Sequence, residues 1–222
     1  MSANWRALLA VASLASLTML ASAAEIAAQV TDQAGQPVAD AIVVAAPVDW
    51  ILRPAARHAK AVIDQIDKQF SPRVKAIYVG TSVSFPNKDN IRHHVYSFSS
   101  AKRFELPLYA GTPARRVVFD KPGVVVLGCN IHDWMVAYLY VSASPYFAKT
   151  AADGKAMLRD LPARSYTVRV WHPELDGDEE ATSKAVDLAA VSRIEVLWAL
   201  PFKTVTRLRH VPTSDAWQRL GE

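Results

Sequence analysis

The residues of this 222-residue chain most able to do chemistry lie in one short segment, residues 129–135, with the sequence CNIHDWM. The segment places a thiol at Cys129, an imidazole at His132 and a thioether at Met135. Two imidazoles, one thiolate and a weak axial thioether are the donor set of copper sites that carry single electrons. The segment supplies three of these four donors, so such a site needs a second histidine. The alternative is an ordinary buried cysteine beside a core methionine, because free cysteine is among the most buried residue types.

The N-terminal residues 1–23 have the features of an export signal. Arg6 supplies a positive charge, residues 7–20 form an apolar run, and Ala21, Ser22 and Ala23 form a small-residue cleavage site. The apolar run is short for a segment that crosses a bilayer. We therefore expect a periplasmic protein that is free of the membrane after cleavage, and an uncleaved membrane anchor is the alternative.

Cysteine usage supports a metal site in such a compartment. Cys129 is the only cysteine, whereas exported proteins usually pair their cysteines in disulfides. An unpaired cysteine suggests a reactive thiol or an intermolecular bridge, and metal ligation is a third solution. The charges are mixed along the chain, with 25 Lys and Arg against 21 Asp and Glu, which does not indicate a nucleic-acid partner.

Strand signals dominate the mature chain. Short segments rich in β-branched and aromatic residues, bounded by turn residues, predict strands at residues 41–44, 76–79, 117–119, 124–127, 137–141, 166–171 and 194–198. Regularly spaced short strands favour β-sandwiches, so we predict an all-β protein. Weak helical signals at residues 55–66 and 214–220 are the exceptions.

Two patterns of another kind flank the middle of the chain. Residues 29–43 read as a strand, a Gly-containing turn and a second strand, and they resemble the start of the carboxypeptidase regulatory-like (transthyretin-like) β-sandwich module. Residues 153–166, followed by a strand, resemble its second half. This resemblance implies a split sandwich of residues 24–49 and 146–200, an inserted domain of residues 50–145, and a C-terminal tail of residues 201–222. The alternative is a pair of generic hairpins.

The second histidine is sought upstream of the cysteine. Gly80 suits a hairpin turn, the alternation after it suits a half-buried strand, and an Asn-rich loop then leads to His93 and His94. Adjacent residues on a strand point to opposite faces, so both rings could reach one metal only through a bulge.

The spacing of these residues resembles that of the small cupredoxins amicyanin and plastocyanin. In that family the first copper histidine lies six residues after an asparagine, as His93 lies after Asn87 here. The second half of the family pattern is matched in order and spacing by Phe119, Gly123, Cys129 and His132. Met135 gives the short His-x2-Met loop of amicyanin.

This resemblance implies a cupredoxin-like Greek-key β-sandwich, inserted in or packed against the smaller one, with one type 1 copper. The implied ligands are His93, Cys129, His132 and Met135. The residues implied to support these ligands from outside are Asn87, His94 and Asn130. Ile131 and Trp134 would surround His132 where redox partners dock, and plain core packing is the alternative for Trp134.

The whole mature chain also resembles a family of exported proteins labelled methylamine utilization proteins. Residues 83–87, 93–99, 128–135, 145–148 and 171–173 carry this resemblance. Its label implies an association with amine oxidation in some members, and the resemblance implies redox partners such as a c-type cytochrome or a periplasmic dehydrogenase. We expect a monomeric electron carrier and no enzyme activity, because the sequence contains no recognisable hydrolase motif. A copper chaperone or storage protein, or a metal-free β-sandwich binding module, is the alternative.

Overall fold

The structure, a computed structural model, describes residues 23–49, 51, 59–113 and 115–203. The predicted signal peptide up to residue 22, the tail beyond residue 203 and the helical signal at residues 214–220 lie outside the described residues. In the part of the chain that is described, no helix is long and apolar enough to cross a membrane.

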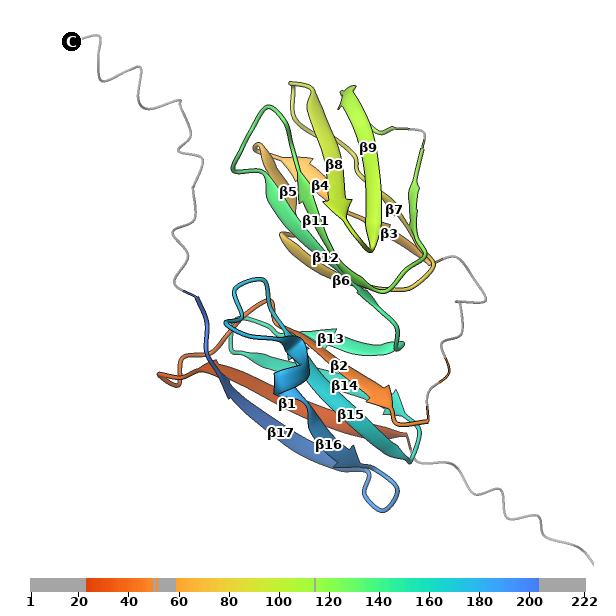
Figure 1. Cartoon of the computed structure of the whole chain (residues 1–222), viewed down its shortest axis with the longest axis vertical. Helices are drawn as coiled ribbons and strands as arrows, with labels where there is room; N and C mark the ends of the chain where they lie inside the picture. The colour runs from red at the N-terminus through yellow and green to blue at the C-terminus, as the bar shows by residue number, and fades with distance from the viewer. Residues whose placement is uncertain (1–22, 50, 52–58, 114, 204–222) are drawn as a thin grey trace, which may run out of the picture.

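The prediction of an all-β protein is confirmed. Apart from one 3-10 turn, η1 (Glu179–Thr182), the regular elements of the described residues are strands. They form two sandwiches, one above the other in the view of Figure 1.

The lower sandwich combines strands from both ends of the chain. One sheet has the order β14-β1-β17, with bounds Lys155–Leu161, Ala24–Asp32 and Arg193–Leu200. The other has the order β13-β2-β15-β16, with bounds Tyr146–Lys149, Ile42–Pro47, Ser165–Trp171 and Lys184–Asp187. Alternate residues of β1, such as Ile26, point into a core shared with Tyr166 and Leu161. Both halves of the predicted split module thus contribute to one core, while its exact boundaries stay a prediction.

The upper sandwich lies between β2 and β13 in chain order. Its larger sheet has the order β6-β12-β11-β8-β9, with bounds Val74–Tyr78, Val136–Ser142, Gly123–Gly128, His93–Ser99 and Lys102–Tyr109. The facing sheet has the order β10-β7-β3, with bounds Val117–Phe119, Thr81–Ser84 and Lys60–Val62. A short hairpin of β4 (Asp64–Ile66) and β5 (Gln69–Ser71) completes it. Buried Phe119, Leu127 and Leu139 belong to the core between these sheets.

Two local predictions were wrong. The described part of residues 55–66 forms β3 and β4 rather than a helix, because Ile63 and Gln65 are buried while Val62 and Ile66 are exposed, which is a period of two. Gly80 does lie in a turn, with φ of 87°, but β6 and β7 belong to different sheets. The turn therefore carries the chain across the sandwich instead of closing a hairpin.

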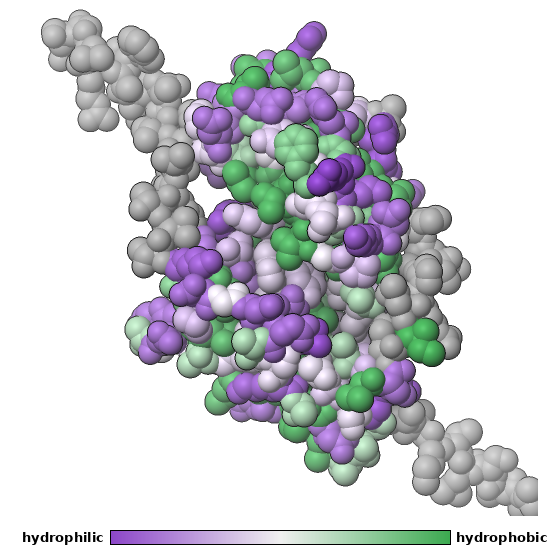
Figure 2. Space-filling view, viewed as in Figure 1, coloured by the Kyte–Doolittle hydropathy of each residue, from purple (hydrophilic) through white to green (hydrophobic). Residues whose placement is uncertain are grey.

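A third apolar cluster joins the two sandwiches. It contains Ile42 and Val44 of β2 together with Val74 and Tyr140, whose ring lies 5.5 Å from the ring of Trp171. The outer face of the five-stranded sheet is thus covered at β6 and β12. It stays open at β8, where Phe98 is 76% exposed, and Figure 2 shows apolar residues gathered over this region.

Glu179 should make stability depend on pH at this junction, where its carboxylate accepts a 2.6 Å hydrogen bond from Tyr140. Burial raises the pKa of Glu179 above its ordinary value, although the hydrogen bond from Tyr140 and the charge of Arg169 oppose the rise. A raised carboxyl pKa stabilises the fold fully below the unfolded pKa, and this contribution is lost as the pH rises through the folded pKa. Glu179→Gln lacks the titrating group, so its stability relative to wild type should be greater at neutral pH than at pH 4.5, the ordinary pKa of the group. Urea unfolding at both pH values measures this, and a difference independent of pH contradicts it.

Candidate metal centre

The end of the β11–β12 pair positions the segment 129–135. Gly128 and Val136 are the last paired residues of these antiparallel strands, so the segment between them must turn back sharply. The backbone amide of Met135 donates to the carbonyl of His132 at 3.0 Å, which closes the turn. As a result the Sγ of Cys129 lies 3.9 Å from the Nδ1 of His132.

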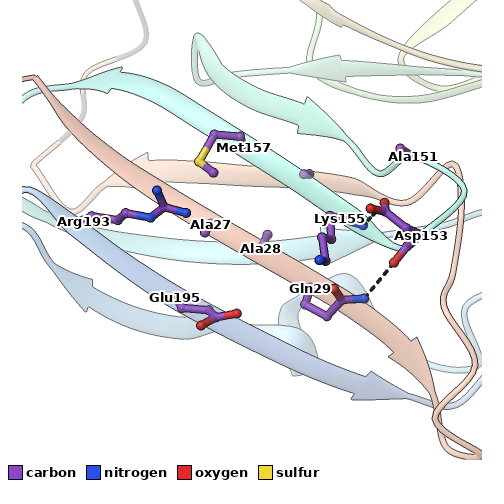
Figure 3. A pocket seen from close by; sticks show the side chains of 10 residues that line it. Ala27, Ala28, Gln29, Ala151, Asp153, Lys155, Met157, Arg193 and Glu195 are labelled. Carbon is purple, nitrogen blue, oxygen red and sulfur yellow. Dashed lines mark hydrogen bonds between the residues drawn. The ribbon is translucent and has the colours of Figure 1, made fainter.

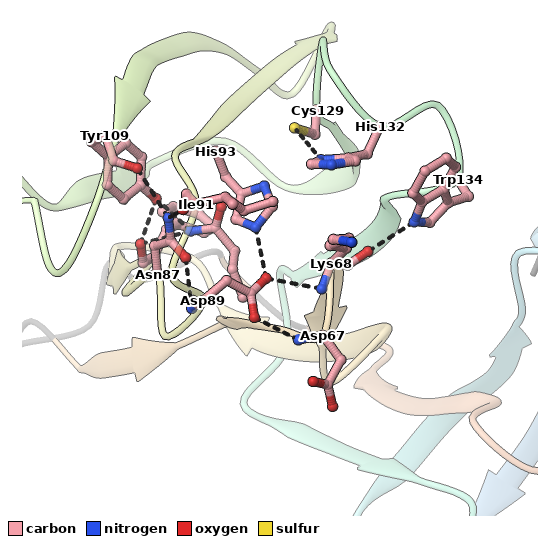
Figure 4. A network of polar contacts seen from close by, with 12 residues as sticks. Asp67, Lys68, Asn87, Asp89, Ile91, His93, Tyr109, Cys129, His132 and Trp134 are labelled. Atoms are coloured by element: carbon pink, nitrogen blue, oxygen red, sulfur yellow. Dashed lines mark hydrogen bonds and ion pairs between the residues drawn. The ribbon is translucent and has the colours of Figure 1, made fainter. Parts of the chain in front are cut away.

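His93 reaches the same point from β8, the strand next to β11. Its ring centroid lies 5.0 Å from that of His132, and one donor atom each from His93, Cys129 and His132 lie within 4.8 Å of one another. His93 is fully buried, Cys129 is 4% exposed and His132 is half-buried. Figure 4 shows these three side chains facing one another. Within the described residues, no other set of three His, Cys, Asp or Glu side chains converges in this way.

The donor set fits a copper ion. The Nδ1 atom of His93 is buried and has no hydrogen-bond partner, which costs free energy unless another group binds it. The other ring nitrogen, Nε2, lies 2.7 Å from a carboxylate oxygen of Asp89, so Nδ1 is the atom left for a ligand. Two imidazoles and one thiolate are the donors common to copper sites that carry single electrons.

Met135 lies in the same apolar core as Cys129 and is 1% exposed. Its burial beside the end of β12 is compatible with an axial thioether and equally with ordinary packing. Its role as a ligand stays a prediction.

Asn87 shapes the loop that delivers His93. Its side-chain amide donates to the carbonyls of Ile91 at 2.7 Å and Tyr109 at 3.0 Å, and its oxygen accepts from the amide of Asp89 at 3.0 Å. Tyr109 also borders this loop, because its carbonyl accepts a hydrogen bond from Asn87. Burial raises the pKa of Tyr109 to about 12, a hydrogen bond from Gln65 opposes the rise, and the charge of the Cys129 thiolate adds to it.

His94 is not brought to this cluster. The register of β8 against β9 does shift between His93 and Val95, but the His94 ring faces away and its Nε2 lies 2.8 Å from Glu105. Its ring lies 5.5 Å from that of Tyr96 on the outer face of the sheet. Any effect of His94 on the donor cluster would therefore pass through the backbone of β8, because its ring contacts Glu105 and Tyr96 instead.

The predicted docking residues differ in their surroundings. Ile131 is 49% exposed, so it is accessible beside His132. Asn130, which was predicted instead to support the ligands from outside, is also exposed, and that role stays a prediction. Trp134 is half-buried, with its ring 5.2 Å from that of His132 and its Nε1 donating to the carbonyl of Lys68 at 3.0 Å. Trp134 thus packs against the site more than it projects from it.

Asp89 is the main site residue that sequence reasoning missed. The signal available was an acidic residue four positions before His93, inside the loop that begins at Asn87. That spacing has no general meaning in a loop, so only the folded chain shows the contact.

Gly128, which precedes the cysteine, lies under the ring of Tyr96. A Cβ atom at this position would lie 2.7 Å from Cζ of Tyr96. We expect Gly128→Ala to lower the free energy of unfolding by about 1–3 kcal/mol, the usual cost of overpacking. The cost should fall when Tyr96→Ala removes the ring, because contacting residues couple. Urea unfolding of the four proteins tests this, and an equal cost in both backgrounds contradicts the contact.

A separate hollow of about 330 Å³ lies on the outer face of β14, β1 and β17 in the lower sandwich. Figure 3 shows Lys155, Met157, Arg193 and Glu195 around Ala27. These side chains mix charges and include neither histidine nor cysteine, and they lie on the lower sandwich, whereas the donor cluster lies in the upper one. The hollow is therefore not part of the candidate metal centre.

Comparisons with known proteins give structural matches only. A scan against protein-family models and a search of curated proteins find no match. Matching solved structures include a purple cupredoxin from Nitrosopumilus maritimus, at 28% identity over 37% of this chain and 99% of that chain, with a TM-score of 0.34. The copper-containing nitrite reductase NirK from Thermus scotoductus matches at 25% identity over 52% of this chain and 28% of its own, with a TM-score of 0.36. A reduced amicyanin mutant matches at 20% identity over 44% of this chain and 98% of its own, with a TM-score of 0.34.

Proposed function

We propose that this chain is a periplasmic type 1 copper protein that carries single electrons between redox partners. The observation that carries the proposal is the convergence of His93, Cys129 and His132, whose donor atoms lie within 4.8 Å of one another inside a β-sandwich. When bound, copper would supply a one-electron couple between Cu(II) and Cu(I). The proposed ligand set is completed by Met135.

The fold itself keeps the donor side chains in fixed positions. Cys129 directly follows β11, and His93 is the first residue of β8, a neighbouring strand of the same sheet. Strands anchored in a packed core resist displacement, so the same donor arrangement can serve both oxidation states with little movement. No catalytic acid or base is assigned, because electron transfer does not need one.

The two sides of the site differ in their exposure to solvent. Cys129 is 4% exposed, which shields the thiolate from solvent oxidants and from exchange with other thiols. His132 is half-buried beside the exposed Ile131, so it is the donor through which a docked partner would exchange electrons. The burial of Cys129 favours an electron carrier over a chaperone, which needs exchangeable ligands.

The proposed compartment, pathway and redox partners rest on the sequence alone. The export signal at residues 1–23 supports the periplasm, and the resemblance to methylamine utilization proteins supports a link to amine oxidation. A c-type cytochrome or a periplasmic dehydrogenase is the proposed class of partner.

Redox cycling of the purified mature protein tests the function. Loaded with one Cu(II) per chain, it should accept one electron from a reductant and return it to an oxidant over repeated cycles without losing copper. Release of Cu(I) to a copper-free acceptor protein during the cycle would instead support a chaperone. Failure to take up stoichiometric copper would support a metal-free binding module.

A further inference from the structure

We propose that Asp89 is a positioning residue that holds His93 ready for the metal and biases the centre toward Cu(II); this inference rests on the proposed function. The Asp89 carboxylate receives three hydrogen bonds within the network of Figure 4. Its Oδ2 lies 2.7 Å from Nε2 of His93 and accepts from the amide of Lys68 at 2.9 Å, and its Oδ1 accepts from the amide of Asp67 at 2.7 Å. The side chain is only 12% exposed.

These bonds fix which nitrogen of His93 carries the proton. An ionised carboxylate can only accept hydrogen bonds, so the Nε2 atom carries the hydrogen of this contact. Nδ1 is buried and has no hydrogen-bond partner, which costs free energy unless another group binds it. With Nε2 held by Asp89, Nδ1 is the ring nitrogen left to bind a ligand, on the side of Cys129 and His132.

The same turn supports the opposite side of the site. Asp67 and Lys68 link β4 to β5 with φ of 52° and 56°, which is uncommon for residues other than glycine. The bonds from their amides to Asp89 stabilise this turn, and the carbonyl of Lys68 accepts from Trp134, which packs on His132. One two-residue turn thus holds both imidazoles, through Asp89 on one side and Trp134 on the other.

The charge of Asp89 has a consequence for the metal. It lies one imidazole away from the donor cluster, where a negative charge attracts Cu(II) more than Cu(I). Loss of a hydrogen-bonded partner of a metal-binding histidine typically weakens metal affinity by about 10–100-fold. Removal of the Asp89 charge should therefore weaken Cu(II) binding by that factor and Cu(I) binding less, which raises the reduction potential.

Asp89→Asn and Asp67→Asn form a matched pair for the test. Both remove one negative charge, but Asp67 joins the network only through its backbone amide, and Figure 4 shows its carboxylate pointing away. Asparagine also tolerates the positive φ of position 67. Chelator competition should show Cu(II) binding weakened about 10–100-fold in Asp89→Asn and unchanged in Asp67→Asn. Equal affinities in Asp89→Asn and wild type, or equal losses in the two variants, overturn the proposal.

A second measurement uses the wild-type protein without metal. Nitrogen NMR of the histidine side chains should show that His93 carries a hydrogen on Nε2, the atom that faces Asp89. The opposite tautomer overturns the role of Asp89 even if Asp89→Asn does not fold. Because this readout needs no copper, it separates failure of the inference from failure of the proposed function, which would appear as absent copper uptake by the wild type.

Discussion

Cys129→Ser is expected to abolish the intense visible absorption that the proposed function predicts for the Cu(II)-loaded protein. That band arises from charge transfer between a thiolate and Cu(II), and Cys129 is the only cysteine of the chain. A serine hydroxyl is a hard, neutral donor, whereas the soft thiolate favours copper. We expect Cu(II) affinity to fall by more than about 100-fold, above the usual effect of an outer-shell change.

Absorption spectroscopy and chelator competition on the two proteins provide the measurement. Asp133→Asn is the control, since Asp133 is an exposed residue of the same segment and has no proposed role at the metal centre. It should keep the band. A band that persists in Cys129→Ser would mean that the thiolate of Cys129 is not its source.

Phe85→Ala should cause the largest loss of stability among the changes considered. Phe85 is fully buried, and its ring stacks on that of Phe104 with centroids 5.7 Å apart. Truncating a buried phenylalanine typically costs about 3–5 kcal/mol. The carbonyl of Phe85 also accepts hydrogen bonds from Gln65 and Tyr109. The cavity left by the substitution would therefore also loosen these two residues beside the donor cluster.

Urea unfolding measures this loss, with Phe98→Ala as the matched control. Phe98 is 76% exposed on the outer face of β8. Its truncation should change the free energy of unfolding by no more than about 0.5 kcal/mol, as for most surface substitutions. Similar costs for the two variants would contradict the placement of Phe85 in the core.

Much of the fold could be predicted because its strands carry their own signals. The apolar, β-branched stretches beginning at Val124 and Ala137 correspond to β11 and β12, the pair that closes around Cys129. β9 was not predicted, since it contains Pro107 and alternates charged with apolar residues. Pro107 lies where the pairing of β8 and β9 shifts register, an irregularity that tolerates a missing amide donor.

The candidate site likewise has residues that the sequence predicted and one residue that it did not. Cys129 and His132 are close in sequence, so their spacing was sufficient to place them together, whereas His93 was chosen over His94 only through the resemblance to the small cupredoxins. Asp89 could not be assigned a role, because its contact with Lys68 depends on the β4–β5 hairpin folding against the loop before β8. That hairpin turns through Asp67 and Lys68, a pair that lacks the usual Asn-Gly or Asp-Gly signal.

X-ray absorption at the copper edge of the Cu(II)-loaded mature protein tests most directly whether this sandwich is built around a metal. The fit should require one short sulfur scatterer and two imidazole groups, which Cys129, His93 and His132 alone can provide together among the described residues. A spectrum fitted by oxygen and nitrogen donors without sulfur would show that copper binds elsewhere. The three side chains would then be an ordinary part of the protein's packing.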